Sequence, residues 1–153
     1  MLVGELERYF DLKAVNQVVR AIYKPAGNDS KSKISGFAPV VAQSATMGDA
    51  VSQEILKCAG HQLGLSAATV TSKLGLSDHE FELALVGGVY RAGELIVTPV
   101  RDTIHQVAPR ARVFVSDRPP VLGAARLALR EIGRDVALEI RSEKVQSILG
   151  IMH

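Results

Sequence analysis

The chain has 153 residues, the length of one ordinary folded domain, so we expect residues 1–153 to form a single unit. Hydrophobic residues make up 47% of the sequence and charged residues 22%, a composition that supports a core and excludes intrinsic disorder. The 18 basic and 16 acidic residues are interspersed and give a net charge of +2, which excludes a nucleic-acid surface, and no segment approaches the roughly 18 apolar residues of a membrane span.

The first part of the chain, residues 1–76, is predicted to be helical. Apolar residues recur at helical spacing over residues 6–22, and residues 25–30 break this pattern, as an exposed loop would. A second helix is expected over about residues 32–47, where Gly48 can take the left-handed conformation that closes a helix.

The longest amphipathic helix is expected to begin after Asp49, whose side chain can cap its first turn. The pattern continues to Leu74, and Gly64 is the position where this helix could kink. The apolar residues predicted to share one face are Val51, Ile55, Leu56, Ala59 and Leu63.

The second part, residues 77–132, begins with a strand pattern. An apolar run over residues 81–86 ends in Gly87 and Gly88, which predicts a buried strand followed by a tight turn. A helix is expected directly after this turn, over about residues 89–107.

A second strand and a second helix follow the first pair. Residues 113–115 predict another short buried strand, and residues 121–132 an alanine-rich helix. A crossover of this length between two buried strands is typical of a parallel pair. The fold class is therefore α/β and helix-rich, with a parallel β-α-β-α unit, and the tail over residues 133–153 is interpreted as a helix.

Two strands are too few for a stable parallel sheet with both faces covered. The sequence therefore indicates that the strands completing this sheet are not part of the chain. Because an unpaired strand edge promotes association, we also expect a homo- or hetero-oligomer.

The double glycine is the first candidate ligand site. In open parallel sheets, ligands bind outside the carboxyl ends of the strands, which is where Gly87 and Gly88 lie. Their backbone allows close approach, and the helix expected directly after them offers free N–H groups to a phosphate. This favours a nucleotide, although a glycine pair that only makes a tight turn explains the pattern equally well.

The second candidate is the helix over residues 121–132. Gly123, Ala124 and Ala125 leave one side of it almost free of side chains, so another backbone or a flat ligand can come close. Packing of the helix on a sheet explains the same residues, and both interpretations stay open.

Other ligand motifs are incomplete or absent. A dinucleotide fingerprint needs G-x-G-x-x-G, which Gly87, Gly88 and Gly93 do not reproduce, and the phosphate loop G-x-x-x-x-G-K-[ST] is missing. Cys58 and His61 have a C-x-x-H spacing without a second ligand pair, so we expect no metal site and a Cys58 thiol buried in its helix.

The lone cysteine and the charged first turns indicate a compartment. One cysteine cannot form an internal disulfide, and the amino terminus lacks the long apolar run of a secretory leader. We therefore expect a reducing, cytoplasmic setting.

Three segments together resemble one known family. They are Ala45-x-x-Gly48-Asp49-Ala50, Leu85-Val-Gly-Gly-Val89 and Pro120-Val-Leu-Gly-Ala-Ala-Arg-Leu-Ala-Leu129. In order and spacing they are similar to the carboxyl-terminal part of the BadF/BadG/BcrA/BcrD ATPase family, which includes the N-acetylglucosamine kinases. The resemblance extends over about residues 6–129.

The resemblance implies a partial ribonuclease-H-like carboxyl-terminal lobe of the actin-like ATPase type. It implies that Gly87, Gly88 and Val89 form the adenosine-binding motif, and that the helix with Gly123 and Ala124 forms the second connecting element at the hinge. The implied ligand is ATP or ADP with Mg, and the metal would be held mainly by parts of the family that have no counterpart in this chain.

Those absent parts define the functional hypothesis. The family's amino-terminal lobe, with its D-x-G-x-T phosphate loop, acceptor site and catalytic aspartate, has no counterpart, so no catalytic residue is named. The resemblance therefore implies an ATP-binding part of an N-acetylglucosamine kinase-like sugar kinase, truncated or split and inactive alone, which meets an amino-sugar substrate only if the missing lobe is present. The alternative is a non-enzymatic helical interaction module that pairs with another chain.

Overall fold

A computed structural model describes residues 1–23 and 30–133. The chain divides into two compact units, Met1–Val115 and Ser116–His153, and each is described by itself. None of the helices in the described ranges has the length and apolar content needed to cross a membrane.

The first unit starts with the helical part that the sequence predicts. Its elements are α1 (Leu2–Tyr9), the 3-10 helix η1 (Val15–Gln17), α2 (Val18–Ile22), α3 (Ser30–Thr46) and α4 (Ala50–Lys73). The predicted loop over residues 25–30 lies outside the described residues, except for Ser30, which begins α3.

An aromatic cluster packs α1 against α3. The ring centroid of Phe37 in α3 lies 5.3 Å from that of Tyr9 and 5.7 Å from that of Phe10. Tyr9 is exposed and the other two rings are half-buried, and Phe37 also packs against the buried core, so the aromatic cluster joins the amino-terminal helix to the core.

The start of α4 confirms the predicted cap. Gly48 has a φ of 91° and ends the α3 turn, and Asp49 Oδ1 accepts a hydrogen bond of 2.9 Å from the backbone N–H of Ser52. Asp49 Oδ2 also accepts from the N–H of Leu2 at 3.1 Å. These two backbone hydrogen bonds lower the pKa of Asp49 to about 2.

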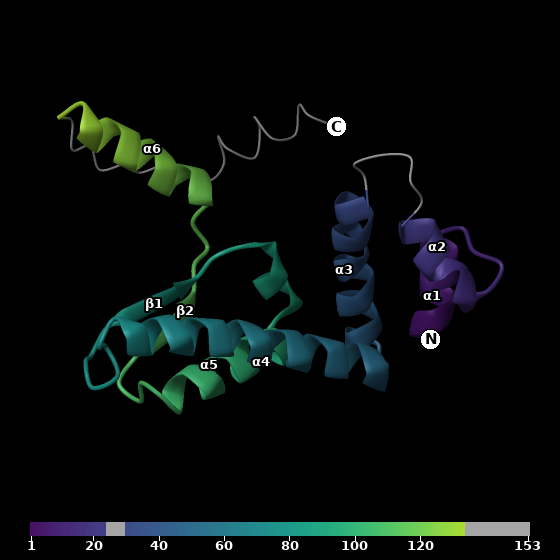
Figure 1. Cartoon of the computed structure of the whole chain (residues 1–153), viewed down its shortest axis with the longest axis horizontal. Helices are drawn as coiled ribbons and strands as arrows, with labels where there is room; N and C mark the ends of the chain where they lie inside the picture. Colours follow the sequence, from purple (N-terminus) through teal and green to yellow (C-terminus); the bar gives the residue numbers. More distant parts are fainter. Residues whose placement is uncertain (24–29, 134–153) are drawn as a thin grey trace. The chain divides into compact units, whose positions relative to one another are not determined.

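The small residues of α4 let α5 (Glu94–His105) pack closely along it (Figure 1). The buried residues of α4 recur mostly every fourth position, as Ser52, Leu56, Gly60, Gly64, Ala68 and Thr71. A Cβ at Gly64 would come within 2.7 Å of Thr103 Cβ, so only glycine fits at this spacing. α4 is continuous through Gly64, and the kink that the sequence allowed is not present.

Both predicted strands are present and their parallel pairing is confirmed. β1 (Glu82–Leu85) pairs with β2 (Arg112–Val115), and α5 forms the crossover between them. The prediction that the strands are buried is wrong: Leu85 is the one buried residue of β1, and β2 has none. Leu83 and Leu85 point to the core, while Glu82 lies on the other face and forms an ion pair of 3.2 Å with Arg112. The buried core cluster consists of Val41, Ala45, Leu56, Leu85, Ile96, Val97, Val100, Ile104, Ala108 and Ala111.

The helix predicted over residues 89–107 is wrong at its start. The turn after β1 leads into a 3-10 helix, η2 (Gly88–Ala92), and the α-helix begins only at Glu94. Gly93 separates the two with φ 78° and ψ −153°, a backbone conformation outside the helical region that breaks the hydrogen-bond pattern.

The second unit contains the predicted alanine-rich helix as α6 (Pro120–Glu131). Pro120 occupies its first turn, where a missing N–H costs nothing, and Gly133 follows its end with a φ of 72°. Residues 134–153, for which a helix was predicted, lie outside the described residues.

Candidate functional site

The double glycine lies at the carboxyl edge of the sheet, as predicted. Leu85 and Val115 are partners in the parallel register, so both strands end at the same edge. Gly87 and Gly88 follow β1 there after one residue. This is the part of a parallel sheet at which ligands bind in α/β proteins.

The structure requires a glycine at only one of these two positions. Gly87 has a φ of 129°, which side-chain-bearing residues rarely adopt, so the turn itself explains this glycine. Gly88 has no such φ, and a Cβ at Gly88 would meet no atom within 4 Å. Neither backbone conformation nor packing within the described residues requires a glycine at position 88, and the same is true of Gly4 and Gly123.

The turn does not present an α-helix to a phosphate, contrary to the prediction. η2 has five residues and is a 3-10 helix, so it lacks the aligned peptide dipoles of a longer helix. α5 begins with Glu94, whose carboxylate accepts a 2.6 Å hydrogen bond from Thr98 and lies 3.6 Å from Arg101. A carboxylate in the first turn repels a phosphate, so the start of α5 is a poor anion site.

The five predicted nucleotide-binding residues are divided between the two units. Gly87, Gly88 and Val89 follow β1 in the first unit, and Val89 is exposed. Gly123 and Ala124 belong to α6 in the second unit, and both are exposed. A Cβ at Gly123 would meet no atom within 4 Å, so packing within the second unit does not require this glycine.

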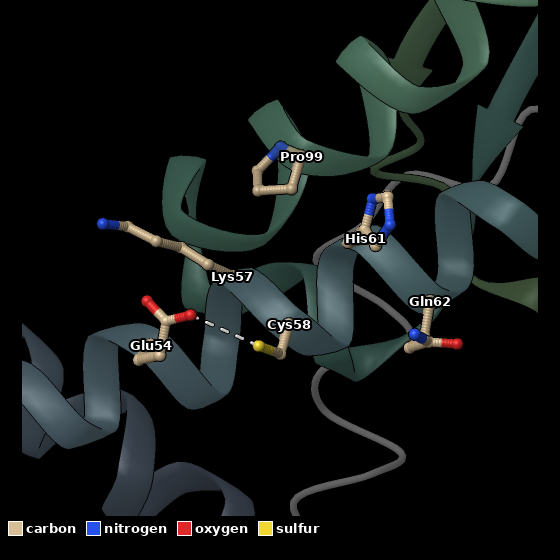
Figure 2. A pocket seen from close by; sticks show the side chains of 6 residues that line it. All are labelled: Glu54, Lys57, Cys58, His61, Gln62 and Pro99. Carbon is tan, nitrogen blue, oxygen red and sulfur yellow. Dashed lines mark hydrogen bonds between the residues drawn. The ribbon is translucent and has the colours of Figure 1, made fainter.

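A groove that the sequence did not predict lies where α4 and α5 meet. It has a volume of about 360 Å³ and is lined by Glu54, Lys57, Cys58, His61, Gln62 and Pro99. Figure 2 shows that Pro99 comes from α5 and the other side chains from α4. The groove is open and shallow, and its polar groups are partly satisfied within the protein.

His61 is held by a hydrogen bond across this groove. Its Nδ1 lies 3.0 Å from Thr103 Oγ1, and the Thr103 hydroxyl donates to the Pro99 carbonyl at 2.7 Å. Because the hydroxyl has one proton and gives it to Pro99, Nδ1 of His61 is the donor to Thr103. That assignment leaves Nδ1 without a free lone pair for a metal ion.

Cys58 is exposed, so the prediction that it is buried is wrong. Its Sγ donates a hydrogen bond of 3.4 Å to Glu54 Oε1, as Figure 2 shows, and this contact raises the pKa of the thiol. A raised pKa opposes the thiolate form that nucleophiles and metal ligands need. The described residues contain no group of three or more His, Cys, Asp or Glu side chains that could hold a metal ion.

Comparison with known proteins gives one informative match. No family model matches the chain, and no solved structure matches it. The N-acetylmuramic acid/N-acetylglucosamine kinase of Clostridium acetobutylicum is 25% identical to it over 131 residues. These residues are 86% of this chain and 42% of that enzyme, so the chain spans less than half the length of the relative it matches. The chain is thus a distant relative of a sugar kinase.

Proposed function

We propose that this chain is the nucleotide-binding carboxyl-terminal part of an ATP-dependent sugar kinase that acts on N-acetylglucosamine or a related amino sugar. The observation that carries the proposal is the match, over most of the chain, to an N-acetylmuramic acid/N-acetylglucosamine kinase. The expected family is the BadF/BadG/BcrA/BcrD ATPases, with an actin-like, ribonuclease-H-like lobe, and the expected compartment is the cytoplasm.

Gly88 suggests where on this chain the nucleotide would bind. This glycine has no structural requirement within the described residues and lies at the ligand-binding edge of the sheet. A residue without a Cβ at such an edge lets a flat ring approach the backbone. We therefore place the adenosine of ATP against residues 87–89.

The electrostatics of the same turn favour adenosine there over phosphate. Glu94 lies in the first turn of the next helix and would oppose a triphosphate. The phosphates, Mg and the amino sugar would then be held by polypeptide outside this chain. Phosphoryl transfer depends on positioning, metal ions and a base on the acceptor, so the chain contributes by holding the nucleotide and is inactive alone.

The test is a titration of ADP by calorimetry into the native product, isolated from its own cell, and into two variants. Gly88→Val adds a side chain where the protein has room for one, so we expect an unchanged circular dichroism spectrum and an affinity at least about tenfold weaker. Gly4→Val is the control, because a Cβ at Gly4 also meets no atom within 4 Å and Gly4 lies in α1.

The outcomes separate the parts of the proposal. Equal ADP affinity in Gly88→Val and in the parent protein would refute the placement of adenosine at this turn. Absence of any ADP or ATP binding by the native product would refute the kinase proposal. The non-enzymatic alternative, an interaction module, is favoured by the exposed apolar residues on α4 and predicts association that ignores nucleotide.

A further inference from the structure

We infer that residues 87–93 form a hinged strap, which Tyr90 latches against the core, and that the latched strap is the form of the protein that binds nucleotide. The strap comprises Gly87, the 3-10 helix η2 and Gly93. Its hinges and its latch follow from contacts and backbone angles alone. Its link to nucleotide rests on the proposed function, which places adenosine at residues 87–89.

The strap is fixed to the core on both sides. Leu85, the last residue of β1, is 4% exposed, and Ile96, in the first turn of α5, is fully buried. Both belong to the main core cluster. Two buried anchors of this kind let the strap move while β1 and α5 stay packed.

Between these anchors the strap has few contacts. All of its residues are exposed except Tyr90 and Ala92, which are half-buried and pack against the core cluster. Within the described part of the chain, no backbone hydrogen bond joins residues 87–92 to another element, and the bond of 3.1 Å from the Gly93 N–H to the Tyr90 carbonyl lies inside the strap. A segment held mainly by two side chains opens more easily than the elements on either side of it.

The strap begins and ends at glycines whose backbone angles suit hinges. Gly87 has a φ of 129° and a ψ of 163°, and Gly93 has a φ of 78° and a ψ of −153°. A Cβ at either glycine would meet no atom within 4 Å, so each has open space on that side. Glycine adopts positive and negative φ about equally well, so a rotation at these positions meets little resistance. Residues at the ends of elements that absorb such rotations are the usual hinges of moving segments.

Tyr90 is the latch, because it lies midway between the two hinges and its ring is half-buried against the core. The side chains on either side of it, Val89 and Arg91, are exposed. Ala92 has only a methyl group, so the ring of Tyr90 supplies most of the apolar area that the strap buries. Loss of this ring should therefore release the strap without disturbing the rest of the core.

The latch also connects the helical part of the chain to the turn at which adenosine is placed. η2 contacts α3 and α5, and Phe37 of α3 packs against the same core cluster as Tyr90 and against Tyr9. In an unlatched strap, residues 87–89 would lose the fixed backbone shape against which a flat ring can lie. Nucleotide affinity should therefore fall with the fraction of molecules that are latched, and bound nucleotide should in turn favour the latch.

The first test is hydrogen exchange, without nucleotide, in the native product and in three variants made in the same cell. Tyr90→Ala removes the latch, and we expect exchange at residues 90–93 to become at least about tenfold faster while exchange at residues 100–104 of α5 stays unchanged. Tyr90→Phe keeps the ring, so it should exchange as the parent protein does. Tyr23→Ala is the matched control, because Tyr23 is 75% exposed, and it should change neither region.

A calorimetric titration of ADP into the same four proteins tests the link to nucleotide. We expect the affinity to fall several-fold in Tyr90→Ala and to stay unchanged in Tyr90→Phe and Tyr23→Ala, because only the first variant lacks the latch. Saturating ADP should also slow exchange at residues 90–93 of the parent protein.

The results that would overturn the inference are distinct. Unchanged exchange at residues 90–93 in Tyr90→Ala would show that Tyr90 is not a latch. Exchange that becomes faster at residues 100–104 as well would show that the strap opens only when the whole unit unfolds. Equal ADP affinity in Tyr90→Ala and in the parent protein would refute the link between strap and nucleotide. A parent protein that binds no ADP would refute the proposed function and this link together, whereas the exchange rates would still decide whether the strap exists.

Discussion

Replacement of Gly60 by alanine tests the close contact on which the α4–α5 pair depends. Gly60 is buried, and a Cβ there would meet the carbonyl oxygen of Ile96 and lie 3.2 Å from its carbonyl carbon. The overlapping atoms belong to the backbone of Ile96, so no side-chain rotation can relieve the overlap. The two helix backbones must move apart, which weakens the packing of their neighbours.

The size of the effect follows from two opposing contributions. Alanine in a helix interior is about 1 kcal/mol more favourable than glycine. An extra methyl group in a tightly packed core costs about 1–3 kcal/mol, and an overlap with backbone atoms belongs at the upper end. We therefore expect Gly60→Ala to lower the free energy of unfolding by about 2 kcal/mol, or the melting temperature by roughly 4–8 °C for a domain of this size.

The measurement is urea unfolding followed by far-ultraviolet circular dichroism, with Gly4→Ala as the matched control. Gly4 also lies inside a helix, but its Cβ would meet no atom within 4 Å, so this variant gains helix propensity without an overlap. It should be as stable as the parent chain or slightly more stable. If Gly60→Ala were as stable as Gly4→Ala, the close approach of α4 and α5 would be wrong.

Two further predictions concern titratable groups of α4 and of its amino-terminal cap. The pKa of Asp49 is lowered from 3.8 to about 2, so its stabilising effect is complete above pH 3.8 and is lost as the pH falls towards 2. The melting temperature should therefore drop between pH 3.8 and pH 2. Asp49→Asn has no carboxyl group to protonate, so it should lack the part of this drop that comes from Asp49. The hydrogen bond to Glu54 raises the pKa of Cys58, so Glu54→Gln should speed alkylation of the thiol by iodoacetamide at pH 8. If Asp49→Asn showed the full drop in melting temperature on acidification, the prediction for Asp49 would be wrong. If Glu54→Gln left the alkylation rate of Cys58 unchanged, the prediction for Cys58 would be wrong.

The sequence predicted correctly those features that depend on residues close together in the chain. The short apolar runs bounded by turn residues predicted both strands and their parallel pairing, and Asp49 predicted the start of α4. The start of α5 was predicted too early. The apolar residues on both sides of Gly93 have helical spacing, but Gly93 has a positive φ that interrupts the helix, and α5 begins after it. The spacing of apolar residues indicates which of them can share one face of a helix. It does not reveal the backbone conformation of a single glycine.

The error at Cys58 has a geometric cause. Its sequence neighbours Leu56 and Ala59 are apolar, and the prediction of burial followed from them. Around a helix, however, residues two positions apart lie about 200° from each other, so a buried Leu56 places Cys58 on the opposite side. The small residues Gly60 and Gly64 were the signal of the buried side, since they recur at the spacing of a helix contact.

Local packing does not require a glycine at position 88, which follows β1 at the carboxyl edge of the sheet and whose Cβ would meet no atom within 4 Å. The sequence located the turn correctly, but turn geometry and a nucleotide site predict the same two glycines. The titration of ADP into Gly88→Val separates these explanations, because the variant keeps the turn and changes only what can approach it.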